Sequence, residues 1–239
     1  MHGGKLPLDI EGRRLRVGFE SLEHYRQVRA FHTFEPGFLD EFRARARDAG
    51  VVYDVGANLG LYSLTAGACN GEAEVHSFEP EPGLCRLIEE SALANGLSGI
   101  HVLPMCLGEA DSTLQLTLKG NSGHFVSRDG AAEGTVEVPV RRVDSLVREG
   151  ALPPPDLVKI DVEGYEASVL RGMAGVLEQH HPTVLVEVHP RELEAYGESA
   201  DGVDAFMAAL NYERTLLRAP GVGGRTTHRQ THVRYLHKE

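Results

Sequence analysis

Residues 51–60 read VVYDVGANLG, and this stretch decides the fold. Its first five residues are hydrophobic except for Asp54, so they predict a buried strand. Gly56 and Gly60 then favour a tight loop, and the residues from Leu59 to Ala68 predict a helix. A strand, a glycine loop and a helix in this order open a doubly wound α/β fold, in which ligands bind at the carboxyl ends of the strands.

The rest of the chain alternates short apolar runs with amphipathic helical segments. Four further strands are predicted at 75–79, 100–105, 157–160 and 183–188. Helices are predicted at 84–92, 167–177 and 203–210. This alternation produces right-handed crossovers and a mostly parallel sheet. The last two strands, near 214–217 and 233–236, are expected to pair antiparallel because no helix connects them. A second antiparallel pair is predicted between 114–118 and 135–141.

The chain has 239 residues, of which 41% are hydrophobic and 25% charged, as in ordinary globular proteins. We expect a main domain over residues 50–239, preceded by a cap or lid over residues 1–49. The cap contains two segments with amphipathic helical spacing, LEHYRQVRAFH and FLDEFRARAR. No apolar run reaches the length of a membrane span, so a membrane protein is not predicted.

Charge and cysteine content bear on partners and location. Lys and Arg number 24 against 35 Asp and Glu, a formal net charge of −11. This balance argues against nucleic-acid binding, which needs a basic surface. Three cysteines without paired spacing, and an amino terminus without an apolar leader, favour a reducing, cytoplasmic location. Between Arg214 and Lys238 the chain is locally basic, which fits either a solvated edge hairpin or the rim of a site for an acidic substrate.

Two acidic residues flank the glycine loop at the ends of neighbouring predicted strands. Asp54 precedes the loop, where its carboxylate would repel a pyrophosphate and attract the ammonium and sulfonium groups of S-adenosylmethionine. Glu79 follows the loop by about 20–25 residues, a spacing that suits the two hydroxyls of a ribose. Each acid alone has a simpler explanation, Asp54 as a cap of the following helix and Glu79 as a solvated loop residue. Together, their order and spacing favour a nucleoside site.

Further acidic residues and a histidine follow the fourth and fifth strands. The run KIDVEGYE begins at Lys159 and places Asp161 and Glu163 at one strand end, which is costly without a cation, hydrogen bonds or a metal. After the fifth strand, Glu187 and His189 share a face by period-two alternation. Lys159 is expected to pair with Glu187 across neighbouring strands. This leaves Asp161 and His189 as the preferred catalytic residues, with His189 the better base near neutral pH.

With these motifs identified, the chain resembles the FkbM-type, S-adenosylmethionine-dependent methyltransferases. The matching runs are DVGANLGLYS, SFEPEP, LVKIDVEGYEASVLRG and LVEVHP, in the family's order over residues 51–190. KIDVEGYE is the most specific of them, whereas the glycine loop alone would indicate only a class I methyltransferase. The resemblance implies a Rossmann-like, seven-stranded methyltransferase sheet with an antiparallel strand pair at its carboxyl-terminal end and a helical cap at its amino-terminal end.

The resemblance also implies a role for each matching residue. It places the methionine half of S-adenosylmethionine against four residues in and before the glycine loop: Asp54, Gly56, Asn58 and Gly60. It places the ribose at Glu79 and the adenine ring near Cys106 and Leu107. The methyl group and the acceptor would face three residues: Asp161, Glu163 and His189. Related sugar O-methyltransferases bind a divalent cation with acids at the fourth-strand position, so Mg²⁺ there is an open expectation.

The expected activity is transfer of a methyl group to a hydroxyl of a small-molecule acceptor, either a sugar or a polyketide-type natural product. Methylation of a carboxylate or of a nitrogen is the alternative within the same fold. An NAD-dependent oxidoreductase would instead bind NAD and not S-adenosylmethionine. A non-catalytic nucleoside-binding module would bind the cofactor without turnover. The residues identify neither the acceptor nor the oligomeric state, and a homodimer stays open.

Overall fold

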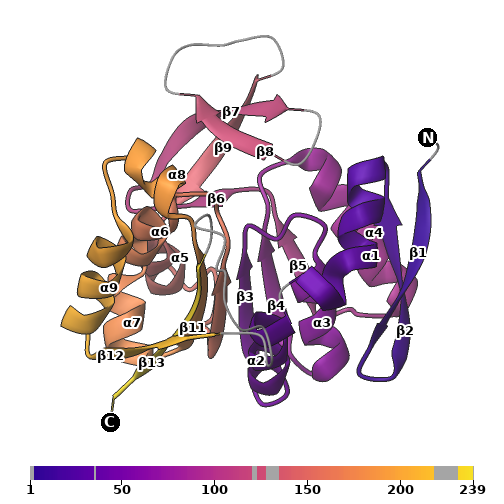
Figure 1. Ribbon diagram of the computed structural model, residues 1–239, viewed down its shortest axis with the longest axis horizontal. Helices are drawn as coiled ribbons and strands as arrows, with labels where there is room; N and C mark the ends of the chain where they lie inside the picture. Colours follow the sequence, from indigo (N-terminus) through magenta and orange to yellow (C-terminus); the bar gives the residue numbers. More distant parts are fainter. Residues whose placement is uncertain (1–2, 35, 120–122, 128–134, 218–230, 239) are drawn as a thin grey trace.

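The computed structural model describes residues 3–34, 36–119, 123–127, 135–217 and 231–238. Its centre is a seven-stranded sheet with the order β12-β13-β11-β10-β3-β4-β5 (Figure 1). These strands are β3 (Val51–Val55), β4 (Glu74–Phe78), β5 (Ile100–Leu103), β10 (Leu157–Ile160), β11 (Thr183–Val188), β12 (Tyr212–Leu216) and β13 (Thr231–His237). The strands from β11 to β5 run parallel, and β13 pairs antiparallel with both β11 and β12. The predicted doubly wound sheet and its antiparallel carboxyl-terminal pair are therefore confirmed.

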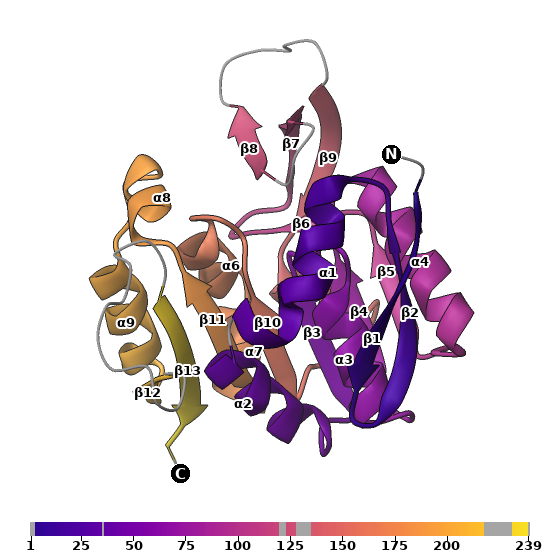
Figure 2. The ribbon, with the colours of Figure 1, turned by 45° about the vertical axis from the view of Figure 1, so that its right-hand side comes forward.

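Helices cover both faces of this sheet (Figures 1 and 2). One face carries α2 (Pro36–Ala46), α3 (Leu61–Cys69) and α4 (Pro82–Asn95). The other carries α5 (Val143–Arg148), α6 (Glu166–Gly172), α7 (Ala174–His180) and α9 (Ala200–Ala209). Two more helices, α1 (Leu22–Phe34) and α8 (Pro190–Ala195), lie toward the carboxyl ends of the parallel strands. Both faces of the sheet are thus shielded from water.

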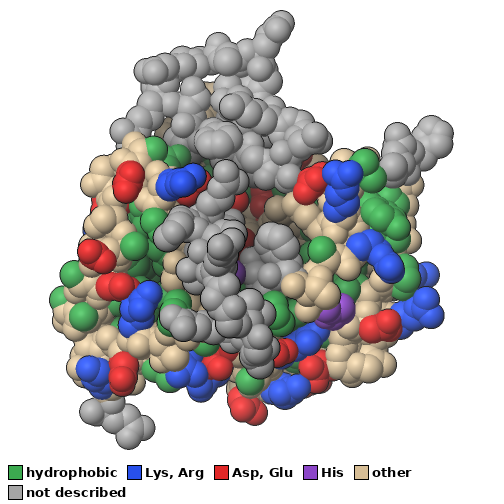
Figure 3. Space-filling view, viewed as in Figure 1, with side chains coloured by type: hydrophobic (Ala, Val, Ile, Leu, Met, Phe, Trp, Pro, Cys, Tyr) green, Lys and Arg blue, Asp and Glu red, His purple; other side chains and the backbone are tan. Residues whose placement is uncertain are grey.

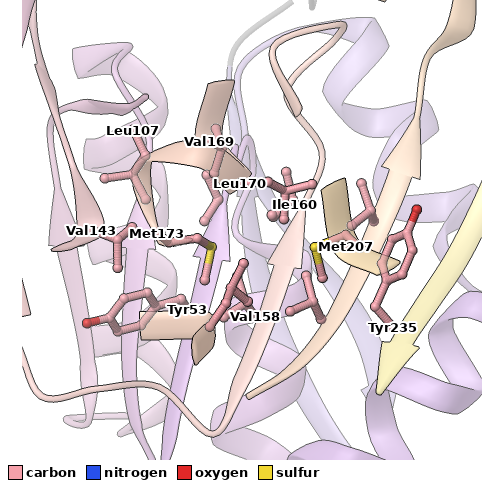
Figure 4. Packing of buried hydrophobic residues seen from close by; sticks show 14 of the residues in the cluster. Tyr53, Leu107, Val143, Val158, Ile160, Val169, Leu170, Met173, Met207 and Tyr235 are labelled. Atoms are coloured by element: carbon pink, nitrogen blue, oxygen red, sulfur yellow. The ribbon is translucent and has the colours of Figure 1, made fainter. Parts of the chain in front are cut away.

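The apolar runs of the central strands are continuous because each strand is buried on both faces. On β10, Val158 and Ile160 pack on the side of α6 and α7 (Figure 4). The side chain of Leu157 points to the opposite face of the sheet, where it packs with Phe38 and Phe42 of α2. Each fully buried side chain of this size stabilises the fold by roughly 1.5–3 kcal/mol. The central strands therefore form the most firmly fixed part of the molecule.

The strand order reverses beside β3. The chain runs from β3 outward to β4 and β5, and it then returns to place β10 against the opposite edge of β3. Loops that leave the carboxyl ends of such neighbours diverge, and they leave a crevice where ligands bind. The glycine loop follows β3 and the KIDVEGYE turn follows β10, so the two main sequence motifs meet at this crevice.

The amino-terminal segment begins with a β-hairpin that was not expected from the sequence. Its strand β1 (Gly4–Ile10) pairs antiparallel with β2 (Arg13–Phe19) around Glu11 and Gly12, which both have positive φ. The hairpin buries four side chains in one cluster with Leu84 and Leu87 of α4: Leu8, Ile10, Leu15 and Val17. In each strand, apolar side chains alternate with mostly charged ones over only a few residues. This alternation was too short to be recognised as a strand from the sequence. The two amphipathic segments that follow form α1 and α2, as predicted.

A smaller sheet stands above the carboxyl ends of the main strands (Figure 1). Its order is β6-β9-β7-β8, and its strands are β6 (Cys106–Leu107), β7 (Ser112–Lys119), β8 (Gly123–Ser127) and β9 (Thr135–Arg141). The predicted antiparallel pairing of 114–118 with 135–141 is confirmed as β7 with β9. β6 follows β5 of the main sheet directly in the chain, and it pairs with β9 of the small sheet. This connection holds the small sheet next to the main sheet, beside the crevice.

The helix predicted over 167–177 is divided into α6 and α7 at Met173. The division follows a close approach of two backbones. A Cβ atom on Gly172 would lie 2.0 Å from the carbonyl oxygen of Gly108, so the last turn of α6 lies directly against the chain that follows β6. Helical periodicity continues across the break, which is why the sequence indicated one helix.

On the face seen in Figure 3, acidic and basic side chains are interspersed among the coloured residues. Two arginines of the basic carboxyl-terminal segment form ion pairs. Arg214 lies 3.0 Å from Asp204, and Arg234 lies 2.8 Å from Glu41. Arg218, Arg225 and Arg229 lie outside the described residues. Over the described part of the chain, every helix is too short or too polar to cross a membrane.

Candidate active site

The glycine loop is fixed by backbone contacts to both neighbouring strands. The N–H groups of Gly56 and Ala57 donate to the carbonyl of Phe78, at 3.0 and 3.1 Å. Gly56 has a φ of 73°, and a Cβ atom there would lie 1.9 Å from the carbonyl oxygen of Asp161. Any side chain at position 56 would push the loop away from β10. Gly60 also has a positive φ, 71°, where it caps the start of α3.

Asp54 lies beneath the glycine loop and is fully buried. Its Oδ2 atom accepts hydrogen bonds from the Ser63 backbone N–H at 2.9 Å and from the Ser63 hydroxyl at 2.6 Å. Its Oδ1 atom lies 3.2 Å from Lys159 Nζ. Asp54 therefore stabilises the first turn of α3, as its simpler explanation predicted. It lines neither of the two cavities described below, and its charge is balanced by Lys159.

Lys159 pairs differently from the expectation. Its ammonium donates to the Gly56 carbonyl at 3.0 Å and lies near Asp54 and, at 3.7 Å, Asp161. Glu187, the expected partner, affects Lys159 through its charge. The register explains the difference, because Lys159 stands opposite Asp54 on β3 and opposite Leu185 on β11. Burial works against the ammonium, but the charges of Asp54 and Asp161 prevail and raise the pKa of Lys159 above its ordinary value.

Glu79 follows β4 and is buried at the edge of the crevice. Its two oxygens accept hydrogen bonds from different backbone groups, from Asn58 N–H at 2.8 Å and from Glu81 N–H at 2.9 Å. Burial raises the pKa of Glu79 to about 8, although these hydrogen bonds favour the charged form. In the ionised form, which hydroxyl groups that donate to Glu79 would favour, each carboxylate oxygen can accept a second hydrogen bond. Glu79 can therefore bind two neighbouring hydroxyl groups at once.

A first cavity opens beside Glu79 at the carboxyl ends of β3 and β4. Its mainly apolar wall combines side chains from several elements: Phe78, Cys106, Leu107, Leu114, Leu116, Tyr165 and Tyr196. Leu114 and Leu116 come from β7, so the small sheet forms part of this wall. Burial raises the pKa of the Cys106 thiol to about 12, which leaves it neutral. An apolar cavity with one buried acid has the chemistry that a purine nucleoside requires.

Asp161 and Glu163 lie in the turn after β10. Glu163 and Gly164 have φ values of 49° and 99°, and a Cβ atom on Gly164 would lie 2.6 Å from the backbone of Glu192. This tight turn brings both acids to the open side of the crevice, where the side chains of Asp161 and Glu163 are 30% and 55% exposed. Burial raises the pKa of Glu163, and the like charge of Asp161 adds to this effect.

His189 lies at the end of β11 among four carboxylates. Its Nδ1 atom is 2.7 Å from Glu166, and its Nε2 atom lies within 3.6 to 3.8 Å of three others: Asp161, Glu163 and Glu187. Burial works against the imidazolium, but Glu166 and the other acids outweigh it and raise the pKa of His189 to about 9. When no metal ion is bound, this pKa keeps His189 cationic at neutral pH. The structure places it behind the cavities rather than on their walls.

A second cavity, of about 370 Å³, lies on the other side of the glycine loop. It is bounded by the loop itself, by Tyr62 of α3 and by one face of α1, which Figure 2 shows in front of the upper ends of β3 and β10. The two cavities share four residues: Gly56, Asn58, Asp161 and Glu163. They therefore meet at the point where the motifs after β3 and β10 come together.

Several lining residues were not identified from the sequence. Leu114 and Leu116 were assigned to a hairpin with no link to the site, and Tyr62 was part of a helix. The α1 residues on the second cavity stand at 23, 26, 27, 30 and 31, with i, i+3, i+4, i+7 and i+8 spacing. That spacing predicted the helix, but it could not show which surface the helix would cover.

The fold and the site define a class of protein. A parallel sheet with one antiparallel strand inserted near its edge, a glycine loop after its first strand and a buried acid after its second are features of S-adenosylmethionine-dependent methyltransferases. Solved structures show the same fold. A methyltransferase FkbM from Methylobacillus flagellatus superposes with a TM-score of 0.54 at 15% identity, over 92% of this chain and 63% of that one. A precorrin-6y C5,15-methyltransferase from Geobacter metallireducens gives 0.51 at 11% identity, over 84% and 87%.

The chain belongs to the FkbM methyltransferase family, whose methyltransferase FkbM domain matches residues 54–214. The hexuronic acid methyltransferase AglP of Haloferax volcanii is 32% identical over 187 residues, which are 76% of this chain and 73% of that protein. The 31-O-demethyl-FK506 methyltransferase FkbM of Streptomyces tacrolimicus is 27% identical over 173 residues, which are 60% of this chain and 66% of that protein. The protein is accordingly a methyltransferase that uses S-adenosylmethionine.

Proposed function

We propose that this protein transfers the methyl group of S-adenosylmethionine to a hydroxyl group of a small molecule. The observation that supports this most strongly is the arrangement of the two cavities. The first suits a nucleoside, the second is larger and is bounded by α1, and they meet at Asp161 and Glu163. A methyl group carried at this junction would face an acceptor in the second cavity.

The chemistry of the walls supports one arrangement of the cofactor. Glu79 binds the ribose hydroxyls, and the adenine ring lies against Cys106 and Leu107 in the first cavity. The methionine half passes over Gly56 and Asn58, which line both cavities, toward the second. Gly60 and Asp54 support this path from below, because one caps α3 and the other fixes its first turn.

The acceptor oxygen must lose a proton as its bond to the methyl carbon forms and the carbon–sulfur bond breaks. Glu163 is the best-placed acceptor for that proton. It lines both cavities, and its raised pKa makes it a stronger base than a solvated glutamate. Asp161, beside Lys159 and His189, accepts a hydrogen bond from the same hydroxyl and orients it. Much of the rate would come from holding the oxygen about 3–3.5 Å from the methyl carbon, in line with the sulfur.

In this scheme His189 has a different role from the general base that the sequence suggested. A cationic imidazolium cannot take up a proton. It can hold Asp161, Glu163 and Glu187 in place, since its Nε2 atom faces all three. Without a cation at this point, the mutual repulsion of these carboxylates would separate them. We therefore assign His189 as a positioning residue.

A divalent cation is the alternative way to hold these acids. One ligand atom from each of Asp161, Glu187 and His189 lies within 4.8 Å of the others, and Glu166 orients the imidazole as an outer hydrogen-bond acceptor does in metal sites. These residues fit a cation provided that His189 is neutral. Such a cation would lower the pKa of a hydroxyl bound to it. Because the imidazolium and the metal exclude each other, activity with and without a chelator distinguishes the two arrangements.

For the acceptor, we propose a sugar or a polyketide-type natural product. The named relatives act on a hexuronic acid and on a demethylated FK506, and the carboxylates of the second cavity suit an acceptor with several hydroxyl groups. Methylation of a carboxylate would leave the base at Glu163 without a purpose, because an ionised carboxylate has no proton to lose. Hydroxyl methylation is therefore favoured.

The test is transfer of an isotope-labelled methyl group from S-adenosylmethionine to a panel of sugars, glycosides and carboxylic acids, with and without Mg²⁺ and with and without a chelator. We expect labelled methyl ethers from a hydroxylated acceptor. Calorimetry with S-adenosylmethionine and with NAD provides the control. Binding of NAD alone would select an oxidoreductase, and cofactor binding without transfer to any acceptor would select a binding module.

A further inference from the structure

One face of α1 forms a wall of the second cavity and carries groups that the proposed chemistry does not use. Glu23, Arg26, Gln27 and Ala30 line the cavity from this helix. Their spacing places them on a single stripe, so all four side chains reach the same side. The cavity floor, in contrast, is formed by the acids at the ends of β10 and β11: Asp161, Glu163 and Glu187.

The two cations that line this cavity among the described residues differ in their surroundings. Lys159 is buried and is occupied by Asp54, Asp161 and the Gly56 carbonyl. Arg26 is 66% exposed, and its ion pair with Glu23 is long, 3.8 Å between Nη1 and Oε2. A pair of this length and exposure holds the guanidinium weakly. Arg26 therefore keeps most of its donors available to a molecule in the cavity.

The geometry points to Arg26 as the residue that selects the acceptor, by binding a carboxylate group on the side of the molecule opposite the reacting hydroxyl. This inference rests on the proposed function and adds a substrate class to it, a polyhydroxylated acid. The acids of the floor repel a carboxylate, whereas the guanidinium attracts one, so the cavity gives such an acceptor a single favourable orientation. In that orientation the hydroxyl end faces Glu163 and the carboxylate faces α1.

A carboxylate fits this site better than a phosphate does. The planar fork of an arginine binds a carboxylate through two parallel hydrogen bonds. A phosphate group brings about twice the charge at neutral pH, and a single exposed arginine would face it while Glu23, Asp161, Glu163 and Glu187 repel it. The neighbouring Gln27 can donate to or accept from a ring hydroxyl, and Ala30 leaves space for the ring.

The test compares two variants on α1. Arg26→Gln removes the cation from the cavity wall. Arg29→Gln removes the same charge from the same helix at an exposed position that does not line the cavity, so it serves as the matched control. Each protein is assayed for methyl transfer to methyl glucuronide and to methyl glucoside, which differ in one carboxylate. Calorimetry measures the binding of both glycosides to the complex with S-adenosylhomocysteine, so that affinity is known even without turnover.

We expect wild type to bind the glucuronide more tightly than the glucoside, and Arg26→Gln to remove that preference. The loss should be about tenfold in glucuronide affinity, the effect of one partly solvated charged hydrogen-bond pair. Affinity for the glucoside and for the cofactor should stay within twofold, and Arg29→Gln should behave as wild type. Equal binding of the two glycosides by wild type, or equal effects of Arg26→Gln and Arg29→Gln, would overturn the inference. Selective binding without transfer to either glycoside would instead contradict the proposed function and leave the carboxylate site intact.

Discussion

The two cavities share four residues but are built in different ways. The first is formed by groups that the sheet fixes, above all Glu79, whose exposed fraction is 2% and whose oxygens are held by two backbone N–H groups. The second is bounded on one side by an added helix, α1, whose lining side chains are mostly part-exposed, with Arg26 66% exposed. The first cavity, the proposed cofactor end, is therefore a property of the fold. The wall that α1 adds to the second cavity, the proposed acceptor end, can change its exposed side chains without disturbing a strand.

A substitution at the junction of the two cavities should have the largest effect on kcat. Glu163→Gln removes the proposed base and keeps its shape, so kcat should fall by about 10²–10⁴-fold while cofactor affinity stays nearly constant. Steady-state rates and calorimetry with S-adenosylhomocysteine measure the two quantities. Asp161→Asn serves as the comparison, with a smaller decrease expected. If Glu163→Gln keeps a wild-type rate, Glu163 is not the base.

Substitution of His189 should cause the next largest decrease in kcat. The stabilisation that His189 provides should also be lost as the pH rises. His189→Gln should reduce kcat by about 10²-fold, because Asp161 and Glu163 lose the cation that holds them in place. In the wild type the pKa of His189 is raised to about 9. The stabilisation from the imidazolium is therefore complete below the ordinary histidine value near 6.5 and is lost as the pH rises through about 9.

Melting temperatures and rates between pH 6 and 10 test this prediction. The wild type should lose both stability and activity above about pH 9, and His189→Gln should lack that loss. A rate that instead increases with pH toward 9 would identify His189 as the base. Inactivation of the wild type by a chelator, reversed by Mg²⁺, would identify it as a metal ligand.

The local geometry of the proposed cofactor end could be anticipated from the sequence more fully than that of the proposed acceptor end, for physical reasons. Glycines that need a positive φ and an acid after a neighbouring strand leave local signals, so Gly56, Gly60 and Glu79 could be placed from the pattern alone. The pairing of Lys159 depends on strand register, which a single strand does not reveal. The charge state of His189 depends on four carboxylates brought together by the turn after β10 and by β11. The surface covered by α1 depends on packing across the whole domain.

Glu79 tests the cofactor end directly. Glu79→Ala should weaken the binding of S-adenosylmethionine by about 1–3 kcal/mol, because two ribose hydroxyls lose their acceptor. Calorimetry measures this loss, and the affinity of the acceptor cavity should not change. Glu89→Ala is a suitable control, since it removes an exposed carboxylate from α4 that lines neither cavity. An unchanged affinity in Glu79→Ala would place the ribose elsewhere.

A substitution in the small sheet, which belongs to neither the main sheet nor α1, should have the smallest effect on the protein's function. Leu114 on β7 is half-buried and lines the first cavity, whereas Val138, its partner on β9, is buried and does not line it. Leu114→Ala should weaken cofactor binding by about 1 kcal/mol, the value of the partly buried methyl groups it removes. At saturating cofactor, kcat should be unchanged, because the methyl group and the acids after β10 stay in place. A change in kcat with constant cofactor affinity would show instead that the small sheet contacts the acceptor, and the division between a fold-built cofactor end and a helix-built acceptor end would then be wrong.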